Sequence, residues 1–233
     1  MNIALIIAGG KGERMKSVTP KQFLVIEGKP VIIHTLEKFQ NHPRIDVIAV
    51  VCIKGWDDDL KDYARQFGIT KLKHVVRGGN VGQESIKNGI MAMADNYDGD
   101  AVVLIHDAIR PNLSTKIISD CISSIEQHGL SVVVLPCNEA MLETSDGISS
   151  SRAYPRSQLR RTQTPQGARL SQLVELHKKA AEKGIDNSIA TCTLATEVGE
   201  SVWFVEGSFK NVKITTPEDI DIFRALLEVK DQV

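Results

Sequence analysis

The feature that most constrains the fold is a repeated alternation of short, continuously apolar segments with longer amphipathic ones. Residues 3–8 and 47–53 are apolar throughout, as expected of strands that are buried on both faces of a sheet. Residues 31–39 lie between them and place apolar side chains at helical spacing. Strands that alternate with helices are joined by right-handed crossovers, which build a mainly parallel sheet. The sequence therefore predicts a three-layer α/β domain.

The same alternation continues along the rest of the chain. The further predicted strands are residues 73–76, 101–105, 131–135, 202–205 and 212–215. The further predicted helices are residues 57–67, 83–94, 114–126, 170–183 and 217–229. Thr216 is expected to be the N-cap of the last helix, because Pro217 suits the first helical position.

Residues 136–162 interrupt this pattern. The segment is polar and lacks helical periodicity, and Asp146 followed by Gly147 favours a hairpin turn. We therefore expect an arm that leaves the sheet and serves dimerisation. The chain as a whole, residues 1–233, is predicted to be a single domain that carries this arm.

The composition argues against several classes of protein. Lys and Arg number 28 and Asp and Glu number 29, so the formal net charge is -1. This balance disfavours a nucleic-acid binder that acts through bulk positive charge. No segment reaches the roughly 20 apolar residues that span a bilayer, and the first residues lack the basic region of a signal peptide. We expect a cytoplasmic protein without a membrane or nucleic-acid partner.

Neither the cysteines nor the histidines indicate a metal site. The four cysteines and six histidines are scattered, with no C-x-x-C or H-x-x-x-H spacing. A transition-metal site is therefore not expected.

The strongest local signal is the turn AGGKGERM at residues 8–15, which directly follows the first apolar segment. Ligands of open α/β sheets bind at the carboxyl ends of the strands, and glycines let backbone N–H groups approach a polyphosphate closely. Arg14 and Lys21 add positive charge nearby. Met15 occupies the place where both a dinucleotide fingerprint and a P-loop need glycine. The turn is better explained as a triphosphate cradle of another type than as a structural turn alone.

Two further polar segments follow later strands. Asp107 comes after residues 101–105, where a carboxylate can hold Mg²⁺ or a ribose hydroxyl, or simply cap the next loop. His106 beside it is either a base or, more commonly, a hydrogen-bonded structural residue. The glycine-rich turn RGGNVGQES at residues 77–85 can read a nucleobase through backbone groups, although a flexible turn is the favoured explanation of this segment taken alone.

Lys213 stands in an apolar segment near the end of the chain. An unpaired ammonium group is costly there, so Lys213 is expected to reach a phosphate or a carboxylate. The alternative is a lysine that extends to solvent.

Taken in order, these segments resemble the cytidylyltransferases of 2-C-methylerythritol 4-phosphate and ribitol 5-phosphate. The shared motifs are GGKGERM and PKQF near the N-terminus, HDAIRP at 106–111, TPQ at 164–166 and NVKIT at 211–215. The resemblance extends from residue 3 to about 227. It implies a Rossmann-like nucleotidyltransferase with a mainly parallel twisted sheet and a protruding β-arm. Such an enzyme transfers CMP from CTP to a polyol phosphate, releases pyrophosphate, needs Mg²⁺ and forms a homodimer.

The resemblance also implies roles for individual residues. The catalytic residues would be Arg14, Lys21, Arg156 and Lys213, with Arg156 supplied across the dimer. The nucleotide would be bound by Ala8, Gly9, Gly10, Gly12, Gly79, Asn80, Ser85, Asp107, Ala108 and Arg110. Asp107 would also hold the metal. The acceptor would meet Arg156, Glu139, Thr164 and Lys213.

Three positions depart from the family's pattern. Gly82 stands where the base-binding turn usually has Arg. Glu139 and Ala140 replace the usual Asp-Thr pair, and Ile189 and Ala190 replace a Thr-Asp pair. The last two changes alter polar groups of the expected acceptor pocket, which changes specificity strongly.

These departures favour a polyol phosphate such as ribitol 5-phosphate or glycerol phosphate as the acceptor. A different acceptor that the sequence leaves open is 2-C-methyl-D-erythritol 4-phosphate. The sequence is also compatible with a transferase that uses UTP or another nucleotide with a sugar phosphate, and with a catalytically silent nucleotide-binding homologue.

Overall fold

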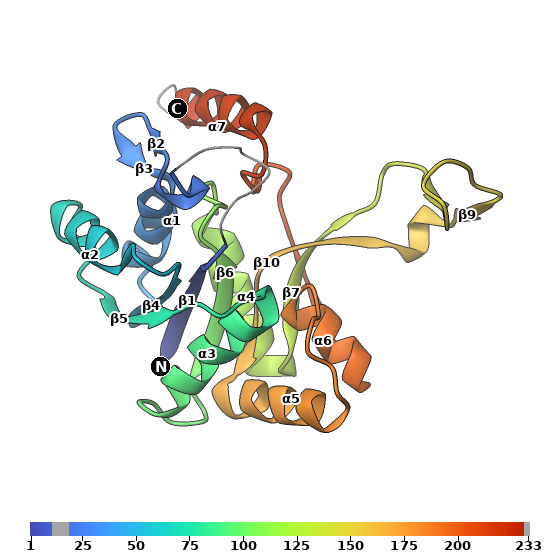
Figure 1. Cartoon of the computed structure of the whole chain (residues 1–233), viewed down its shortest axis with the longest axis horizontal. Helices are drawn as coiled ribbons and strands as arrows, with labels where there is room; N and C mark the ends of the chain where they lie inside the picture. Colours follow the sequence, from blue (N-terminus) through green and yellow to red (C-terminus); the bar gives the residue numbers. More distant parts are fainter. Residues whose placement is uncertain (11–18, 231–233) are drawn as a thin grey trace.

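A computed structural model describes residues 1–10 and 19–230 of the chain (Figure 1). Its central sheet has seven strands in the order β11-β7-β10-β6-β1-β4-β5. The strands are β1 (Asn2–Ala8), β4 (Val47–Cys52), β5 (Leu72–Arg77), β6 (Val102–Asp107), β7 (Ser131–Pro136), β10 (Arg160–Arg169) and β11 (Trp203–Glu206). β10 runs antiparallel to both of its neighbours, and every other pair is parallel. The expectation of a mainly parallel sheet is confirmed.

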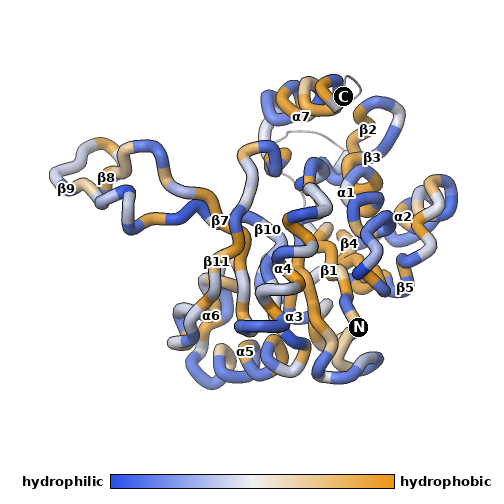
Figure 2. The backbone as a smooth tube through the Cα atoms, turned by 180° about the vertical axis from the view of Figure 1, so that it is seen from behind, coloured by the Kyte–Doolittle hydropathy of each residue, from blue (hydrophilic) through white to orange (hydrophobic). Residues whose placement is uncertain are grey.

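Helices cover both faces of this sheet. The helices of one face are α1 (Val31–Gln40), α2 (Asp57–Gln66) and α4 (Thr115–His128), and those of the other are α3 (Gly82–Ala94) and α5 (Leu170–Glu182). Successive residues of β1 serve the two layers: Ala4 and Ile6 join the first core, whereas Ile3 and Leu5 join the second. Figure 2 shows β1 as predominantly hydrophobic. The three-layer α/β fold is confirmed.

A small third core supports one end of the molecule. The hairpin of β2 (Val25–Ile26) and β3 (Lys29–Pro30) packs with α7 (Pro217–Lys230) around Ile214 and Phe223. α7 begins at Pro217, as predicted. The carboxylate of Asp219 accepts hydrogen bonds from the backbone N–H groups of Thr215 and Thr216, which satisfies donors at the start of the helix.

Besides the short β2–β3 hairpin, which was not predicted, the structure differs from the sequence-based expectation at three places. Residues 212–215, predicted as a strand, are irregular; their apolar character reflects Ile214, which is fully buried beneath α7. The strand β10 was not predicted, because its sequence RRTQTPQGAR is polar and contains a proline. The helix α6 (Thr191–Val198) was not predicted either.

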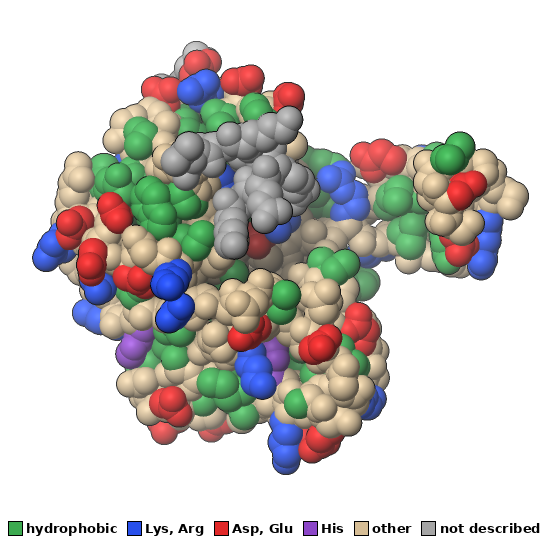
Figure 3. All heavy atoms as spheres, viewed as in Figure 1, with side chains coloured by type: hydrophobic (Ala, Val, Ile, Leu, Met, Phe, Trp, Pro, Cys, Tyr) green, Lys and Arg blue, Asp and Glu red, His purple; other side chains and the backbone are tan. Residues whose placement is uncertain are grey.

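An arm extends away from the sheet between β7 and β10 (Figures 1 and 3). It consists of β8 (Met141–Glu143), β9 (Arg152–Tyr154) and the short 3-10 helix η3 (Arg156–Gln158). β8 and β9 form an antiparallel hairpin. The turn of this hairpin contains Gly147 at φ 71° and Asp146, whose carboxylate accepts backbone hydrogen bonds from Ile148 and Ser149. The hairpin predicted around Asp146 and Gly147 is thus present.

Within the described part of the chain, none of the helices has the length and apolar character needed to cross a membrane.

Candidate active site

A cleft of about 910 Å³ opens at the carboxyl ends of β1, β4, β5 and β6. After β1 the chain builds β4 and β5 on one side, and then returns to place β6 on the other side of β1. Crevices at such reversals of strand order are where open α/β sheets bind ligands. The topology therefore brings four strand ends, and the polar residues that follow them, to one site.

The glycine turns that follow β1 and β5 meet in this cleft. They can approach because Gly9 and Gly78 have no side chain at the point of contact. A Cβ atom on Gly78 would lie 3.2 Å from both the Cys52 carbonyl oxygen and the Gly9 Cα atom. Ser85 holds the second turn, since its hydroxyl accepts a hydrogen bond of 3.0 Å from the Gly79 N–H group. The buried amide of Gln22 holds the first turn by donating to the carbonyl groups of Ala8 (2.7 Å) and Gly10 (3.1 Å). The approach leaves backbone groups exposed to a ligand.

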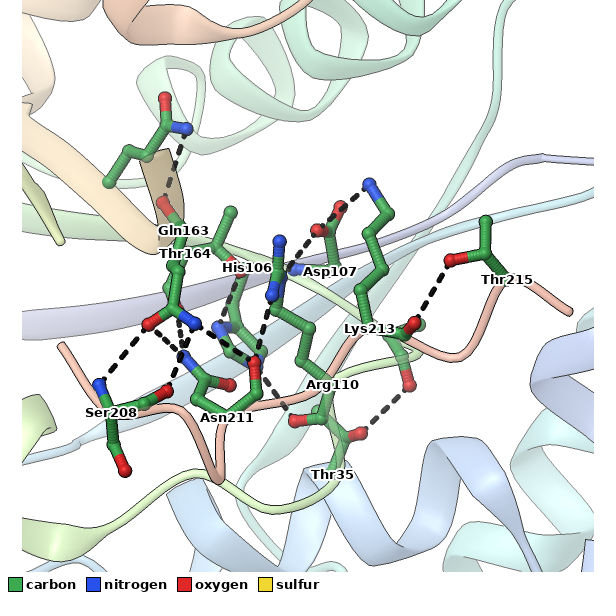
Figure 4. Close-up of polar contacts among 12 residues, drawn as sticks. Thr35, His106, Asp107, Arg110, Gln163, Thr164, Ser208, Asn211, Lys213 and Thr215 are labelled. Carbon is green, nitrogen blue, oxygen red and sulfur yellow. Dashed lines mark hydrogen bonds and ion pairs between the residues drawn. The ribbon is translucent and has the colours of Figure 1, made fainter. Parts of the chain in front are cut away.

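The charged centre of the cleft is Asp107, at the end of β6. Its Oδ2 atom lies 3.0 Å from Arg110 Nε and 3.1 Å from Lys213 Nζ (Figure 4). Burial alone would raise the pKa of Asp107, but the two cations hold it below its usual value. Lys213 thus reaches a carboxylate at the strand end, as its apolar sequence context predicted.

His106 is a structural residue beneath the surface of the cleft. It is fully buried, and burial lowers the pKa of its imidazole to about 4. Its Nε2 atom lies 3.1 Å from the Arg110 carbonyl oxygen, which only accepts hydrogen bonds, so Nε2 carries the proton. Nδ1 then accepts from the Thr164 hydroxyl at 2.9 Å, and this hydroxyl accepts from the Asp107 N–H group at 3.1 Å. The chain of hydrogen bonds orients Asp107 rather than supplying a base.

A second buried network anchors the segment that carries Lys213. Asn211 is fully buried, and its amide donates to the Thr164 carbonyl oxygen at 2.9 Å. The Gln163 amide donates to the carbonyl oxygens of Ser208 and Asn211, and Arg110 Nη1 donates to the latter at 2.9 Å. Figure 4 shows these groups converging beneath Asp107. The network fixes the irregular stretch before α7 against β10.

The structure brings most of the predicted site residues together. The cleft is lined by Ala8, Gly9, Gly10, Lys21, Gly79, Asn80, Ser85, Asp107, Ala108, Arg110, Thr164 and Lys213. Gly12 and Arg14 lie outside the described residues.

Two of the predicted residues do not reach the cleft of their own chain. Glu139 and Arg156 lie on the arm and are exposed. Glu139 is 3.6 Å from Arg161, and Arg156 donates to the Asn138 carbonyl oxygen. Within one chain these two residues do not line the cleft, because the arm carries them away from the sheet. Their role at the acceptor site, for Arg156 across a dimer, stays a prediction.

Several residues of the site were missed by the sequence analysis. Lys54 and Arg77 line the cleft after β4 and β5, and their position at strand ends was the available signal. Gln22, Gln163 and Asn211 act through buried amide contacts, for which the sequence carries no local signal. The described lining contains five cationic side chains (Lys21, Lys54, Arg77, Arg110 and Lys213) and one carboxylate, that of Asp107.

A cation-rich cleft with two glycine turns at the reversal point of a parallel sheet defines an α/β protein that binds a polyanionic nucleotide. The comparisons with known proteins narrow this class. The model of the 2-C-methyl-D-erythritol 4-phosphate cytidylyltransferase (IspD) family matches residues 2–229. The chain belongs to this family, and the expected class of enzyme, a CTP-dependent nucleotidyltransferase, is confirmed.

Named relatives and solved structures agree with this assignment. A ribitol-5-phosphate cytidylyltransferase of Lacticaseibacillus paracasei is 38% identical over 99% of this chain and 100% of that protein. One of Vibrio parahaemolyticus is 39% identical over 100% of this chain and 98% of that protein. A 2-C-methyl-D-erythritol 4-phosphate cytidylyltransferase of Clostridium botulinum is 35% identical, with 97% of each chain covered. The crystal structure of the Francisella tularensis 2-C-methyl-D-erythritol 4-phosphate cytidylyltransferase superposes with a TM-score of 0.82 at 25% identity, covering 96% of this chain and 98% of that one.

Proposed function

We propose that the protein transfers the cytidylyl group of CTP to ribitol 5-phosphate, or to a closely related polyol phosphate, and releases pyrophosphate. The observation that carries this proposal is the cluster of Lys213, Arg110 and Asp107 in a cation-lined cleft. The choice of acceptor is supported by the ribitol-5-phosphate cytidylyltransferases, which are 38% and 39% identical to this chain over nearly their whole length.

The chemistry needs positive charge more than it needs a base. The nucleophile is the phosphate of the acceptor, whose second pKa is about 6, so it is already largely ionised at neutral pH. It must approach an anionic α-phosphorus, and charge then develops on the bridging and leaving oxygens. Lys21, Arg110 and Lys213 supply fixed cations for this purpose. The neutral, buried His106 takes no part in proton transfer.

Asp107 suits the magnesium ion that the family resemblance implies. Mg²⁺ is commonly held by one or two carboxylates together with substrate phosphates and water, and Asp107 is the one carboxylate of the described lining. Both of its cationic partners contact Oδ2, and Asp107 would be the residue of the described lining that holds the ion. When bound, the ion would neutralise charge on the triphosphate.

The arm supports a homodimeric enzyme. Leu142 and Ile148 are 65% and 90% exposed on it, and a two-stranded hairpin by itself is marginally stable in water. A second copy of the chain that covers the arm would stabilise it and would bring Arg156 to the neighbouring cleft. We place the reaction in the cytoplasm, where CTP is made.

The direct test is pyrophosphate release by the purified protein with CTP and Mg²⁺. The acceptors offered are ribitol, glycerol, xylitol, mannitol and methylerythritol phosphates, and UTP, ATP and GTP are compared with CTP. We expect release with CTP and ribitol 5-phosphate well above every other combination. Faster turnover of 2-C-methyl-D-erythritol 4-phosphate would overturn the choice of acceptor, and CTP binding without release would favour a silent homologue.

A further inference from the structure

One wall of the cleft is built by residues 185–191, which lead into α6. Ile189, Ala190 and Thr191 of this segment line the cleft. They occupy the place where the sequence departs from the family's Thr-Asp pattern. The wall therefore bears on what the acceptor pocket recognises.

Thr191 is the residue of this wall whose hydrogen bonding is incomplete. Its side chain is 3% exposed, and its Oγ1 atom has no hydrogen-bond partner among the residues that the structure describes. Neighbouring polar groups are satisfied: Gln166 Oε1 accepts from the Cys192 N–H group, and Thr193 Oγ1 accepts from the Ala190 N–H group, both at 2.9 Å. A buried hydroxyl without a partner destabilises the fold, so a ligand group that pairs with it gains affinity.

Gln83 holds the wall in place from the nucleotide side of the cleft. Its side chain is 8% exposed; Nε2 donates to the Ile185 carbonyl oxygen at 2.9 Å, and Oε1 accepts from the Ser188 N–H group at 2.5 Å. The Ser188 hydroxyl is in turn hydrogen-bonded to Glu197 of α6. Gln83 belongs to the first turn of α3, the same turn in which Ser85 binds the Gly79 N–H group. One helical turn therefore supports both the nucleotide turn and residues 185–191.

We propose that Thr191 is a specificity-determining residue that hydrogen-bonds a hydroxyl group of the acceptor's polyol chain, and that Gln83 is the positioning residue for it. The inference rests on the proposed function. The partner is a neutral hydroxyl rather than the phosphate, because Thr191 is flanked by the apolar residues Ala190 and Cys192, whereas the cations of the cleft serve the phosphates. An alcohol both donates and accepts, and so matches a threonine hydroxyl in either direction.

The first experiment removes the hydroxyl at constant shape. Thr191→Val should lower kcat/KM for ribitol 5-phosphate by about 10-fold, with the Kd for CTP unchanged, whereas Thr191→Ser should keep most of the activity. Thr196→Val is the matched control, because Thr196 is an exposed threonine of the same helix. Deoxy analogues of ribitol 5-phosphate then identify the hydroxyl that Thr191 contacts. The wild type and Thr191→Val should use the analogue that lacks this hydroxyl equally well.

Two results would overturn the role of Thr191. One is a Thr191→Val protein with the kcat/KM of the active wild type. The other is a loss that persists with every deoxy analogue. A wild type that releases no pyrophosphate with any polyol phosphate would instead overturn the proposed function, and this inference with it.

The second experiment tests positioning by Gln83. Gln83→Ala should raise KM for ribitol 5-phosphate by about 5-fold while the Kd for CTP stays constant. The double variant with Thr191→Val should be no worse than Thr191→Val alone, because both changes act through one contact. Gln40→Ala is the matched control: Gln40 also bridges two groups of a distant loop, those of Thr70 and Lys71, away from the cleft. Additive losses in the double variant, or an equal change of KM in Gln40→Ala, would refute positioning by Gln83.

Discussion

Asp107 is the residue on which the polar contacts of the cleft converge. Its backbone N–H group is bound by Thr164, and its carboxylate by Arg110 and Lys213. Arg110 and Lys213 come from segments about a hundred residues apart in the sequence, so folding is what creates the cluster. Each charge in it offsets the burial of the others.

Lys213→Ala is expected to lower kcat by about 100- to 1,000-fold, the effect typical of losing one preorganised charge at a reacting phosphate. The fold should remain intact, because the Lys213 side chain is 41% exposed. Steady-state pyrophosphate release measures the effect, and thermal unfolding monitors the fold. Lys210→Ala serves as the control, since Lys210 is exposed nearby. A Lys213→Ala enzyme with near-normal turnover would remove Lys213 from the mechanism.

The residues of this site that follow strand ends could be predicted from the sequence. Asp107, Gly9 and Gly79 could be predicted because a parallel sheet brings the carboxyl ends of its strands to one edge. Gln163 and Asn211 could not, because a buried amide is recognised by the carbonyl groups it meets, and those lie more than forty residues away in the sequence. Arg156 could be assigned a role only by resemblance, since its place relative to the cleft depends on a second chain.

His177 provides a residue-scale test of stability against pH. It is 3% exposed in α5, its Nε2 atom has no partner among the described residues, and burial, aided by Lys87, lowers its pKa to about 4. In the unfolded state the pKa returns to about 6.5, so the unfolded chain binds the proton first as the pH falls. The free energy of unfolding therefore decreases from about pH 6.5 down to about pH 4 and then levels off.

His177→Leu is expected to remove this part of the pH dependence. The variant should gain about 2 kcal/mol relative to the wild type at pH 5, beyond any difference at pH 8. Urea unfolding at the two pH values measures the difference. His106 titrates in the same window, so the variant should keep a reduced slope. An unchanged slope would contradict the assignment to His177.

At the scale of elements, the cleft depends on the close approach of the turns after β1 and β5. Gly78→Ala places a methyl group 3.2 Å from the Gly9 Cα atom and the Cys52 carbonyl oxygen, so the two turns must separate. We expect KM for CTP to rise by about 10-fold or more, with a loss of about 1–3 kcal/mol in stability from overpacking. Steady-state kinetics with varied CTP and urea unfolding measure the two effects.

Gly82→Ala is the packing control for that variant. A Cβ atom there meets nothing within 4 Å, and alanine favours the helix that begins at this residue. Its stability should equal or exceed that of the wild type. If Gly78→Ala were equally stable and bound CTP normally, the turns would not need their close contact.

The sequence predicted those elements whose residues all lie in the same kind of surroundings, so that their hydropathy pattern is uniform. β1 and β4 are buried on both faces and are continuously apolar. β10 lies inside the sheet too, but its first three residues are exposed, and the six buried residues that follow include the polar Gln163, Thr164 and Gln166. A register shift between Thr162 and Gln166 brings Pro165 into the strand, which a sequence pattern treats as a break. Residues 212–215 show the opposite error, since apolar and polar residues alternate there without a strand, and only Ile214 is buried.

At the scale of the whole molecule, the arm is the part that the single chain leaves unsupported. Met141 and Tyr154 are 43% and 42% exposed on its two strands, and its hairpin pairs only β8 with β9. In the proposed homodimer the arm lies at the interface, so Leu142→Asp together with Ile148→Asp is expected to shift the protein toward monomer, because both charges would then have to be buried. Sedimentation at micromolar concentration measures the shift, and a dimer that persists would place the interface elsewhere.

Complementation between inactive subunits tests whether the arm completes the neighbouring cleft. Arg156→Ala removes the contribution of the arm, and Lys213→Ala removes a cation of the cleft. The homodimer of either variant alone should therefore be inactive. In a mixed dimer, one site combines an intact cleft with an intact partner arm, while the other carries both defects. With random exchange, half of the dimers are mixed and have one good site in two, so about one quarter of the wild-type activity should return. Native mass spectrometry of tagged subunits confirms the exchange. Mixed dimers that form but remain inactive would show that Arg156 does not complete the cleft of the partner chain.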